Sequence, residues 1–323
     1  MLFRSVITHD PPWWAHITQR WRDGLRVAAG SGEAAGLLPA LAIGDTSLQT
    51  AALTDDMRIA GLSHLFAVSG ANLSIVVAAV VVLAMLIGLR ARSVGLLALL
   101  AVAWFVAVAR PSPSVLRAAA MGAIGLAPLL AGTRRIRGGV DGLYALALAS
   151  CVLIAIDPWL SLSWGYALSF FATLGLVIGA SPLQRRLNEL AEAFGTRVRQ
   201  RRSRRSSAAL ERQRLSARQR ILTAARRWFI AALTVSVCAQ VAVAPVLLLM
   251  GAQLSWVALP ANLLAEPAVA TATISGLSAA AVSQVSPAAG HLVARPGVLA
   301  TGWIATVAHR SAQAAHSDPL HMT

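Results

Sequence analysis

A cluster of polar residues interrupts an apolar stretch in the first third of the chain. His64, Ser69 and Asn72 lie there beside Gly70, within the sequence GLSHLFAVSGANLSIVV at 61–77. Ionisable residues inside membrane spans are rare and mark functional paths, and a glycine between polar neighbours is where a spanning helix would open. Two interpretations stay open: a break in the helix that is open to water, or serine and asparagine hydrogen bonds that join helices.

The length of the apolar run indicates how deep this break lies. Leu73 to Leu89 is 17 residues, or about 26 Å of helix, which falls short of the ~30 Å hydrocarbon core. We therefore expect Ser69–Asn72 to reach into the outer part of the bilayer, where non-helical backbone is tolerated only against protein or water.

Two arginines lie near the start of a later apolar run. Arg117 lies about one turn inside the run at 113–131, and Arg110 comes just before that run. A guanidinium stays charged in proteins and binds phosphate or carboxylate through a rigid fork of donors. Arg117 could therefore line a pore or form an ion pair, or it could snorkel to the outer headgroups. Together with His64, these charges could draw a phosphate backbone toward Ser69–Asn72.

Further candidate residues for a pathway lie in the later apolar runs. Asn262 and Glu266 are four residues apart and share a face if the segment is helical. Glu266 is a candidate partner for Arg117, or a pathway residue in its own right. Ser169 and Gln240 complete this set.

Residue patterns that catalyse reactions are missing from the sequence. The chain has no lysine, and therefore neither a P-loop nor a Schiff-base or Ser-Lys centre. It has no H-E-x-x-H or G-x-S-x-G sequence, and its seven histidines form no dense ligand cluster. We expect no catalytic centre, no metal and no cofactor, and therefore a protein that is not an enzyme.

Composition indicates a membrane protein. Apolar residues make up 57% of the chain and charged residues 13%, which leaves too little polar surface for a soluble protein of this length. The apolar runs approach the ~20 residues needed to cross a bilayer. They predict spans at 64–89, 94–110, 113–131, 140–156, 161–180, 229–250, 258–282 and 290–309. The predicted fold is an all-α bundle of about eight transmembrane helices, with discontinuous segments and amphipathic interfacial helices.

The segments before the first run have a different character. Residues 1–35 predict an amphipathic helix in the membrane interface, with Trp21 and Leu25 on its apolar side and Arg22 on its polar side. Residues 37–52 are apolar but contain proline, glycine and aspartate, so we expect a re-entrant segment there rather than a full span.

The arginines predict the orientation of the chain. The connection at 181–228 carries 14 of the 28 arginines, and it would contact anionic lipid headgroups or the backbone of a nucleic acid. Arginines also follow the first and third runs, on the same side as 181–228 if all the preceding runs cross. The positive-inside rule makes that side cytoplasmic and places 110–114 and 157–159 outside.

Short motifs follow one another along most of the chain. They are LLPALAIGD at 37–45, GLSHLFAVSGAN at 61–72, PSVLRAAAM at 113–121, DPWL at 157–160, GYALSFFA at 165–172, AQVAVAP at 239–245 and LPANLLAEP at 259–267. This order resembles the ComEC-type competence proteins, whose membrane domain conducts incoming single-stranded DNA. The second motif is similar to that family's G-L-S-H-L-x-A-x-S-G signature. The resemblance assigns 36–310 to a competence-type transmembrane domain, followed by a tail at 311–323.

The resemblance implies a channel component in the bacterial inner membrane that imports single-stranded DNA during natural transformation. Separate motor and DNA-binding proteins would be its partners, beside the DNA and the membrane lipids. Full-length relatives carry further domains, including a metal-hydrolase-like one, so we expect a short form whose nuclease activity comes from elsewhere. Two alternatives stay open: a secondary transporter for a small anionic solute, and a non-conducting membrane scaffold left by truncation.

Overall fold

The computed structural model describes residues 13–66, 70–109, 112–132, 140–203, 217–251 and 255–316, with the backbone alone at 13–17, 140–141, 193–203 and 217–221. These ranges form α-helices that are joined by turns and short 3-10 segments, and they contain no strand. The predicted all-α fold is therefore confirmed for the part of the chain that is described.

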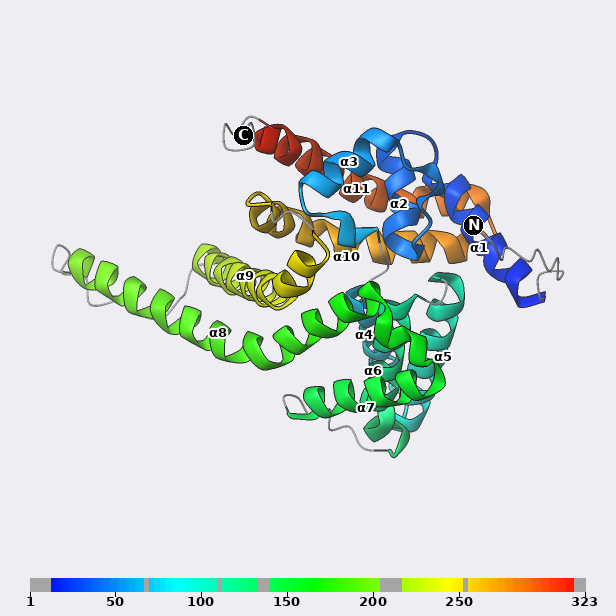
Figure 1. Ribbon diagram of the computed structural model, residues 1–323, viewed down its shortest axis with the longest axis horizontal. Helices are drawn as coiled ribbons and strands as arrows, with labels where there is room; N and C mark the ends of the chain where they lie inside the picture. Colours follow the sequence, from blue (N-terminus) through cyan, green and yellow to red (C-terminus); the bar gives the residue numbers. More distant parts are fainter. Residues whose placement is uncertain are drawn as a thin grey trace.

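The helices form two groups that lie beside one another (Figure 1). The first group holds segments from both ends of the chain: α1 (Trp13–Ala29), α2 (Glu33–Ile43), α3 (Ala51–Ile59), α10 (Ala258–Val282) and α11 (Pro287–His316). The second group follows in chain order: α4 (Gly70–Leu86), α5 (Ala91–Ala109), α6 (Pro113–Leu130), α7 (Val140–Ile156) and the first half of α8 (Trp164–Ser203). The rest of α8 extends away from both groups, and α9 (Ala217–Leu249) packs against α8 (Figure 1).

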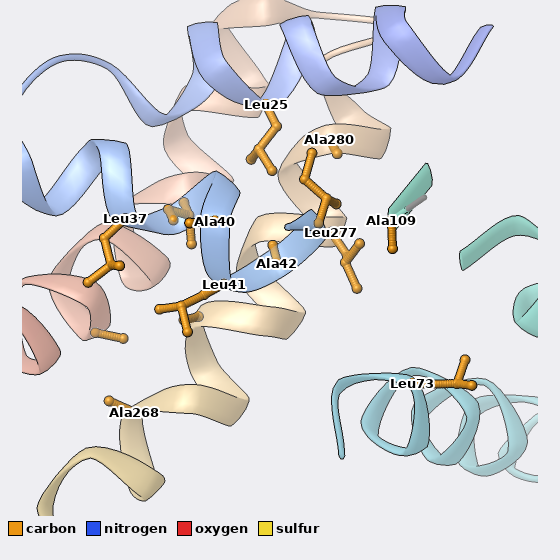
Figure 2. Close-up of a cluster of buried hydrophobic side chains, with 14 of the residues drawn as sticks. Leu25, Leu37, Ala40, Leu41, Ala42, Leu73, Ala109, Ala268, Leu277 and Ala280 are labelled. Carbon is orange, nitrogen blue, oxygen red and sulfur yellow. The ribbon is translucent and has the colours of Figure 1, made fainter. Parts of the chain in front are cut away.

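Helix α2 forms the centre of the first group. All of its residues from Ala35 to Ile43 are buried, as expected for a helix that is apolar all round. Leu37 and Leu41 lie among side chains of α1, α10 and α11 (Figure 2). Small residues let the neighbours approach closely, because a Cβ added at Gly276 would lie 2.7 Å from the Cβ of Ala42.

Within the described ranges, five helical segments are long and apolar enough to cross a membrane, at 91–109, 113–130, 164–192, 222–249 and 258–282. Two others, α4 and α7, have 17 residues each, which is about 26 Å of helix. Helix α11 is not among the five, and α2 spans only 11 residues. All eight predicted spans coincide with helices, but the count of about eight crossings stays a prediction.

At two places the helix ends differ from the ends of the predicted spans. The first predicted span, 64–89, does not start as an α-helix, because Ser63–Leu65 forms a 3-10 turn. The span at 161–180 does not end at its polar boundary but continues as one helix to Ser203. Residues 183–203 are rich in leucine, glutamate, alanine and arginine, which favour helix whether or not the segment lies in a membrane.

The polar face predicted for 1–35 is wrong at Arg22. This side chain is buried, with 5% of its surface exposed. Its Nε and Nη2 donate to the carbonyl of Val108 at 3.0 and 2.8 Å, and Nη2 also donates to Ile43 at 3.4 Å. These carbonyls lie at the C-terminal ends of α5 and α2, which attract cations. The helical spacing of α1 cannot reveal them, because Val108 is 86 residues away.

Candidate functional site

The start of α4 lies against α6. A Cβ added at Gly70 would lie 3.1 Å from the Cβ of Ala118 and 3.8 Å from Nη2 of Arg117. The first turn of a helix has backbone N–H groups without intrahelical partners and carries partial positive charge. Gly70, the first described residue of α4, therefore lies beside the guanidinium of Arg117.

Arg117 is held by side-chain hydroxyls. Only 5% of its surface is exposed. Its Nε and Nη2 donate to Oγ of Ser169 at 3.1 and 2.7 Å, and Nη1 donates to the hydroxyl of Thr173. Ser169 in turn donates to Oγ of Ser114 at 3.1 Å. These contacts fix the plane of the guanidinium and join α6 to α8.

Arg117 has no carboxylate partner among the described residues. The ion pairs there involve Arg26 and His309, and the ion pair of Arg117 with Glu266, considered from the sequence, is not among them. Neutral hydroxyls orient a cation but leave its charge uncompensated, which is costly for a buried group. The arrangement suits a site that receives a mobile anion.

A second buried polar group lies one turn from Ser169 on α8. Tyr166 is 5% exposed, and its hydroxyl oxygen has no hydrogen-bond partner among the described residues. The ring of Tyr166 stacks on Phe170, with ring centroids 6.4 Å apart. A buried hydroxyl without a partner is available for a ligand or a water molecule.

Asn72 has a structural role. It is 2% exposed, donates from Nδ2 to the carbonyl of Leu41 at 2.8 Å, and accepts at Oδ1 from the hydroxyl of Thr273 at 3.3 Å. These bonds tie α4 to α2 and α10. The helix-packing interpretation of the polar break therefore describes Asn72, whereas Gly70 faces the Arg117 site.

The other predicted site residues lie elsewhere. His64 is exposed in the turn before α4, where Nδ1 lies 3.2 Å from the carbonyl oxygen of Gly61. Gln240 on α9 has a buried Nε2 without a partner in the described ranges, and Asn262 and Glu266 are half-buried on α10. No hydrogen bond or ion pair among the described residues joins these three to Arg117. The remaining two, Ser69 and Arg110, lie outside the described residues.

The structure thus brings together Gly70, Arg117 and Ser169 from the predicted set. Thr173 was not among the predicted residues, although it follows Ser169 by four residues and must share its helix face. Ser114, whose contact with Ser169 depends on how α6 meets α8, was not among them either. Along the described ranges, no group of three or more His, Cys, Asp or Glu side chains could hold a metal ion.

Comparison with known proteins agrees with the motif order. The family model described as "Competence protein" matches residues 41–322. The ComE operon protein 3 of Bacillus subtilis (strain 168) is 29% identical over 153 residues, which is 47% of this chain and 19% of that protein. The chain thus matches only about a fifth of the length of this relative, and no solved structure matches it. Because the family model covers nearly all of the sequence, the chain belongs to the competence protein family.

Proposed function

We propose that this membrane protein is a channel component that imports single-stranded DNA across the bacterial inner membrane during natural transformation. The observation that carries the proposal is the buried, carboxylate-free guanidinium of Arg117 beside the start of α4. Membership of the competence family supports a role in DNA uptake. In this proposal the chain is not an enzyme and needs no cofactor, and separate proteins supply the motor and the nuclease.

The chemistry of Arg117 suits a phosphodiester. Nε, Nη1 and Nη2 of Arg117 already donate to Ser169, Thr173 and Met121, which keeps the guanidinium in one orientation. The second N–H of Nη2 is left to donate a charge-assisted hydrogen bond to one phosphate oxygen. The site offers one guanidinium rather than a cluster, so it would bind a phosphate weakly. Conduction requires binding that is weak enough for the phosphate to be released.

The proposed orientation follows from the arginine distribution. The connection at 181–228 would be cytoplasmic, and the protein would cross the membrane several times. Arg117 lies five residues into α6, about 6 Å from its start, so it would face the incoming strand in the outer half of the bilayer. Contacts there would be made before the strand reaches the cytoplasm.

The two alternatives use the same structure differently. A secondary transporter would use Arg117 to bind a small anionic solute such as inorganic phosphate. A non-conducting scaffold would use the Arg117 bonds only to hold α6 against α8. The three functions differ in what the cell takes up, so uptake measurements separate them.

The test is nuclease-protected uptake of labelled DNA in a strain that lacks this protein, complemented with variants. We expect Arg117→Ala to lower protected DNA at least about tenfold, because a charge-assisted contact contributes ~1.5–3 kcal/mol. The matched control is Arg92→Ala, an exposed arginine beyond α4. Insertion of each variant is checked by membrane fractionation.

Three results would overturn the proposal. Normal uptake by an inserted Arg117→Ala protein excludes a role for this guanidinium in the DNA path. Normal uptake in the deletion strain supports the scaffold. Loss of labelled phosphate uptake without any loss of DNA uptake supports the small-anion transporter.

A further inference from the structure

An apolar groove runs between α8 and α9, on a part of the molecule that the proposed DNA path does not use. Its volume is about 450 Å³. The groove is lined by Phe171, Ile178, Leu183, Val237, Val241 and Ala242 together with small residues. Ile178 and Val241 are 60% and 68% exposed, so the groove opens at the surface of the helix pair α8 and α9, which we call the α8–α9 hairpin.

The floor of the groove consists of two glycines on α8. A Cβ added at Gly175 would lie 2.4 Å from the Cβ of Ala242, and one added at Gly179 would lie 3.0 Å from Sγ of Cys238. The missing side chains let the two helices approach, as small residues four apart do in membrane bundles. The apolar groove lies beside this close contact.

The register of the hairpin is regular over a long distance. Gly179 meets Cys238, and twelve residues further along α8 the carbonyl of Ala191 accepts from Nη1 of Arg226, which is twelve residues back along α9. The two helices are therefore antiparallel, and positions on both helices can be placed at the same height along one axis.

The groove is as long as one leaflet of a bilayer is thick. Phe171 and Leu183 are twelve residues apart in one helix, which is about 18 Å. Half of the ~30 Å hydrocarbon core is ~15 Å. An acyl chain that lies in the groove would therefore extend from near the middle of the membrane to its surface.

Positive charge and aromatic rings lie at the end of the groove nearest 181–228. Arg186 follows Leu183 by three residues, and Arg227 precedes Cys238 by eleven, or about three turns, so each continues the groove-lining face of its helix. Both arginines are exposed. Trp228 and Phe229 beside them are 46% and 48% exposed, as is typical of aromatic side chains at a membrane surface.

From this arrangement we propose that the hairpin binds one anionic phospholipid, with an acyl chain between Phe171 and Ala242 and its phosphate on Arg186 and Arg227. Two acidic residues, Glu189 and Glu192, lie further along α8. Glu189 follows Arg186 by three residues, yet no ion pair among the described residues joins the two, which leaves Arg186 for the phosphate. The site is independent of DNA import, because it shares no residue with the Arg117 site.

The experiment is native mass spectrometry of the whole protein in detergent, with phosphatidylglycerol or phosphatidylcholine added. The wild type should retain one phosphatidylglycerol more tightly than phosphatidylcholine. Replacing both arginines, Arg186→Gln with Arg227→Gln, should weaken phosphatidylglycerol binding about thirty-fold, the effect of two basic residues at a membrane surface. Val241→Trp should fill the groove and lower retention of both lipids, with helix content checked by circular dichroism.

The matched control is Arg90→Gln with Arg92→Gln, which removes the same charge from exposed positions outside the groove, and it should bind phosphatidylglycerol like the wild type. An equal loss in this control would overturn the proposal, because the binding would then follow total charge. Equal affinity for the two lipids would overturn it, as would displacement of bound lipid by a second copy of the chain. Full competition by a single-stranded oligonucleotide would assign the arginines to nucleic acid instead.

Discussion

Two buried arginines illustrate how the same residue type takes different roles. Arg22 meets the carbonyl of Val108, at the C-terminal end of α5, where the helix already carries partial negative charge. Arg117 meets the hydroxyls of Ser169 and Thr173, which carry no net charge. Arg22 therefore stabilises the fold by joining α1 to α5. The charge of Arg117, in contrast, remains available to a ligand.

A third buried charge belongs to Asp45, which follows α2 and lies outside the predicted spans. It accepts from Nε of Arg26 at 2.7 Å and from the backbone N–H of Ser47 at 3.2 Å. Burial alone would raise the pKa of Asp45, but the hydrogen bonds from Arg26 and Ser47 outweigh it and lower the pKa below its ordinary value of 3.8. A lowered pKa in the folded state means that the ionised carboxylate stabilises the fold.

The ionised carboxylate of Asp45 should make the stability of the protein depend on pH in acid. The contribution of Asp45 is present above pH 3.8 and is lost as the pH falls through its lowered pKa. We expect the unfolding midpoint of the detergent-solubilised protein to fall more steeply below pH 3.8 in the wild type than in Asp45→Asn. Asp55→Asn, at an exposed position, should keep the wild-type slope. Parallel curves for wild type and Asp45→Asn would refute the assignment.

At the scale of elements, the contact between α8 and α9 depends on the absence of side chains. Gly175 faces Ala242 and the carbonyl of Cys238, and the backbone there cannot move without shifting the whole helix. Gly125 on α6 differs, because a Cβ added there would meet nothing within 4 Å. A side chain at Gly175 is therefore excluded by the packing of α9, whereas a side chain at Gly125 would change only the helix propensity of α6.

We predict opposite effects for alanine at these two glycines. Gly175→Ala would place a Cβ 2.7 Å from the carbonyl oxygen of Cys238, and overpacking of this kind costs about 1–3 kcal/mol. Gly125→Ala should be neutral or stabilising by about 0.5–1 kcal/mol, because alanine favours helix over glycine. Thermal unfolding midpoints in detergent measure both. A Gly175→Ala protein as stable as the wild type would show that α8 and α9 do not approach this closely.

At the scale of the whole molecule, the two groups of helices meet at the start of α4. Asn72 joins that start to α2 and α10 in the first group, while Gly70 contacts α6 in the second. Arg22 makes a second link, from α1 to α5. The Arg117 site therefore lies close to the junction of the groups, where a change in their arrangement would alter access to it.

Orientation in the membrane is the prediction that concerns the whole chain. In a protein with Cys151 and Cys238 replaced by alanine, Ser161→Cys should react with an impermeant maleimide in intact cells. Glu189→Cys should react only after permeabilisation, because the arginine-rich connection would be cytoplasmic. Both positions are exposed. The reverse pattern, or labelling of both positions from one side, would contradict the predicted orientation.

Several features of the fold could be predicted because they depend on local sequence. The helices at 94–110, 113–131 and 258–282 were predicted within a few residues of their observed ends. Apolar length and proline or glycine positions determine such elements through interactions between near neighbours in the chain. A break near Ser63–Asn72 was one of two interpretations that the sequence left open, and the 3-10 turn at Ser63–Leu65 agrees with it.

The sequence by itself determined an all-helical membrane protein, its family and the presence of an arginine inside an apolar run. Tertiary structure decided that Arg22 is buried against helix ends, that Asn72 is a packing residue, and that Arg117 meets Ser169 and Thr173. These contacts join residues that are 31 to 86 positions apart. Helical periodicity reports which residues share a face, but only the packing of the helices determines what that face meets.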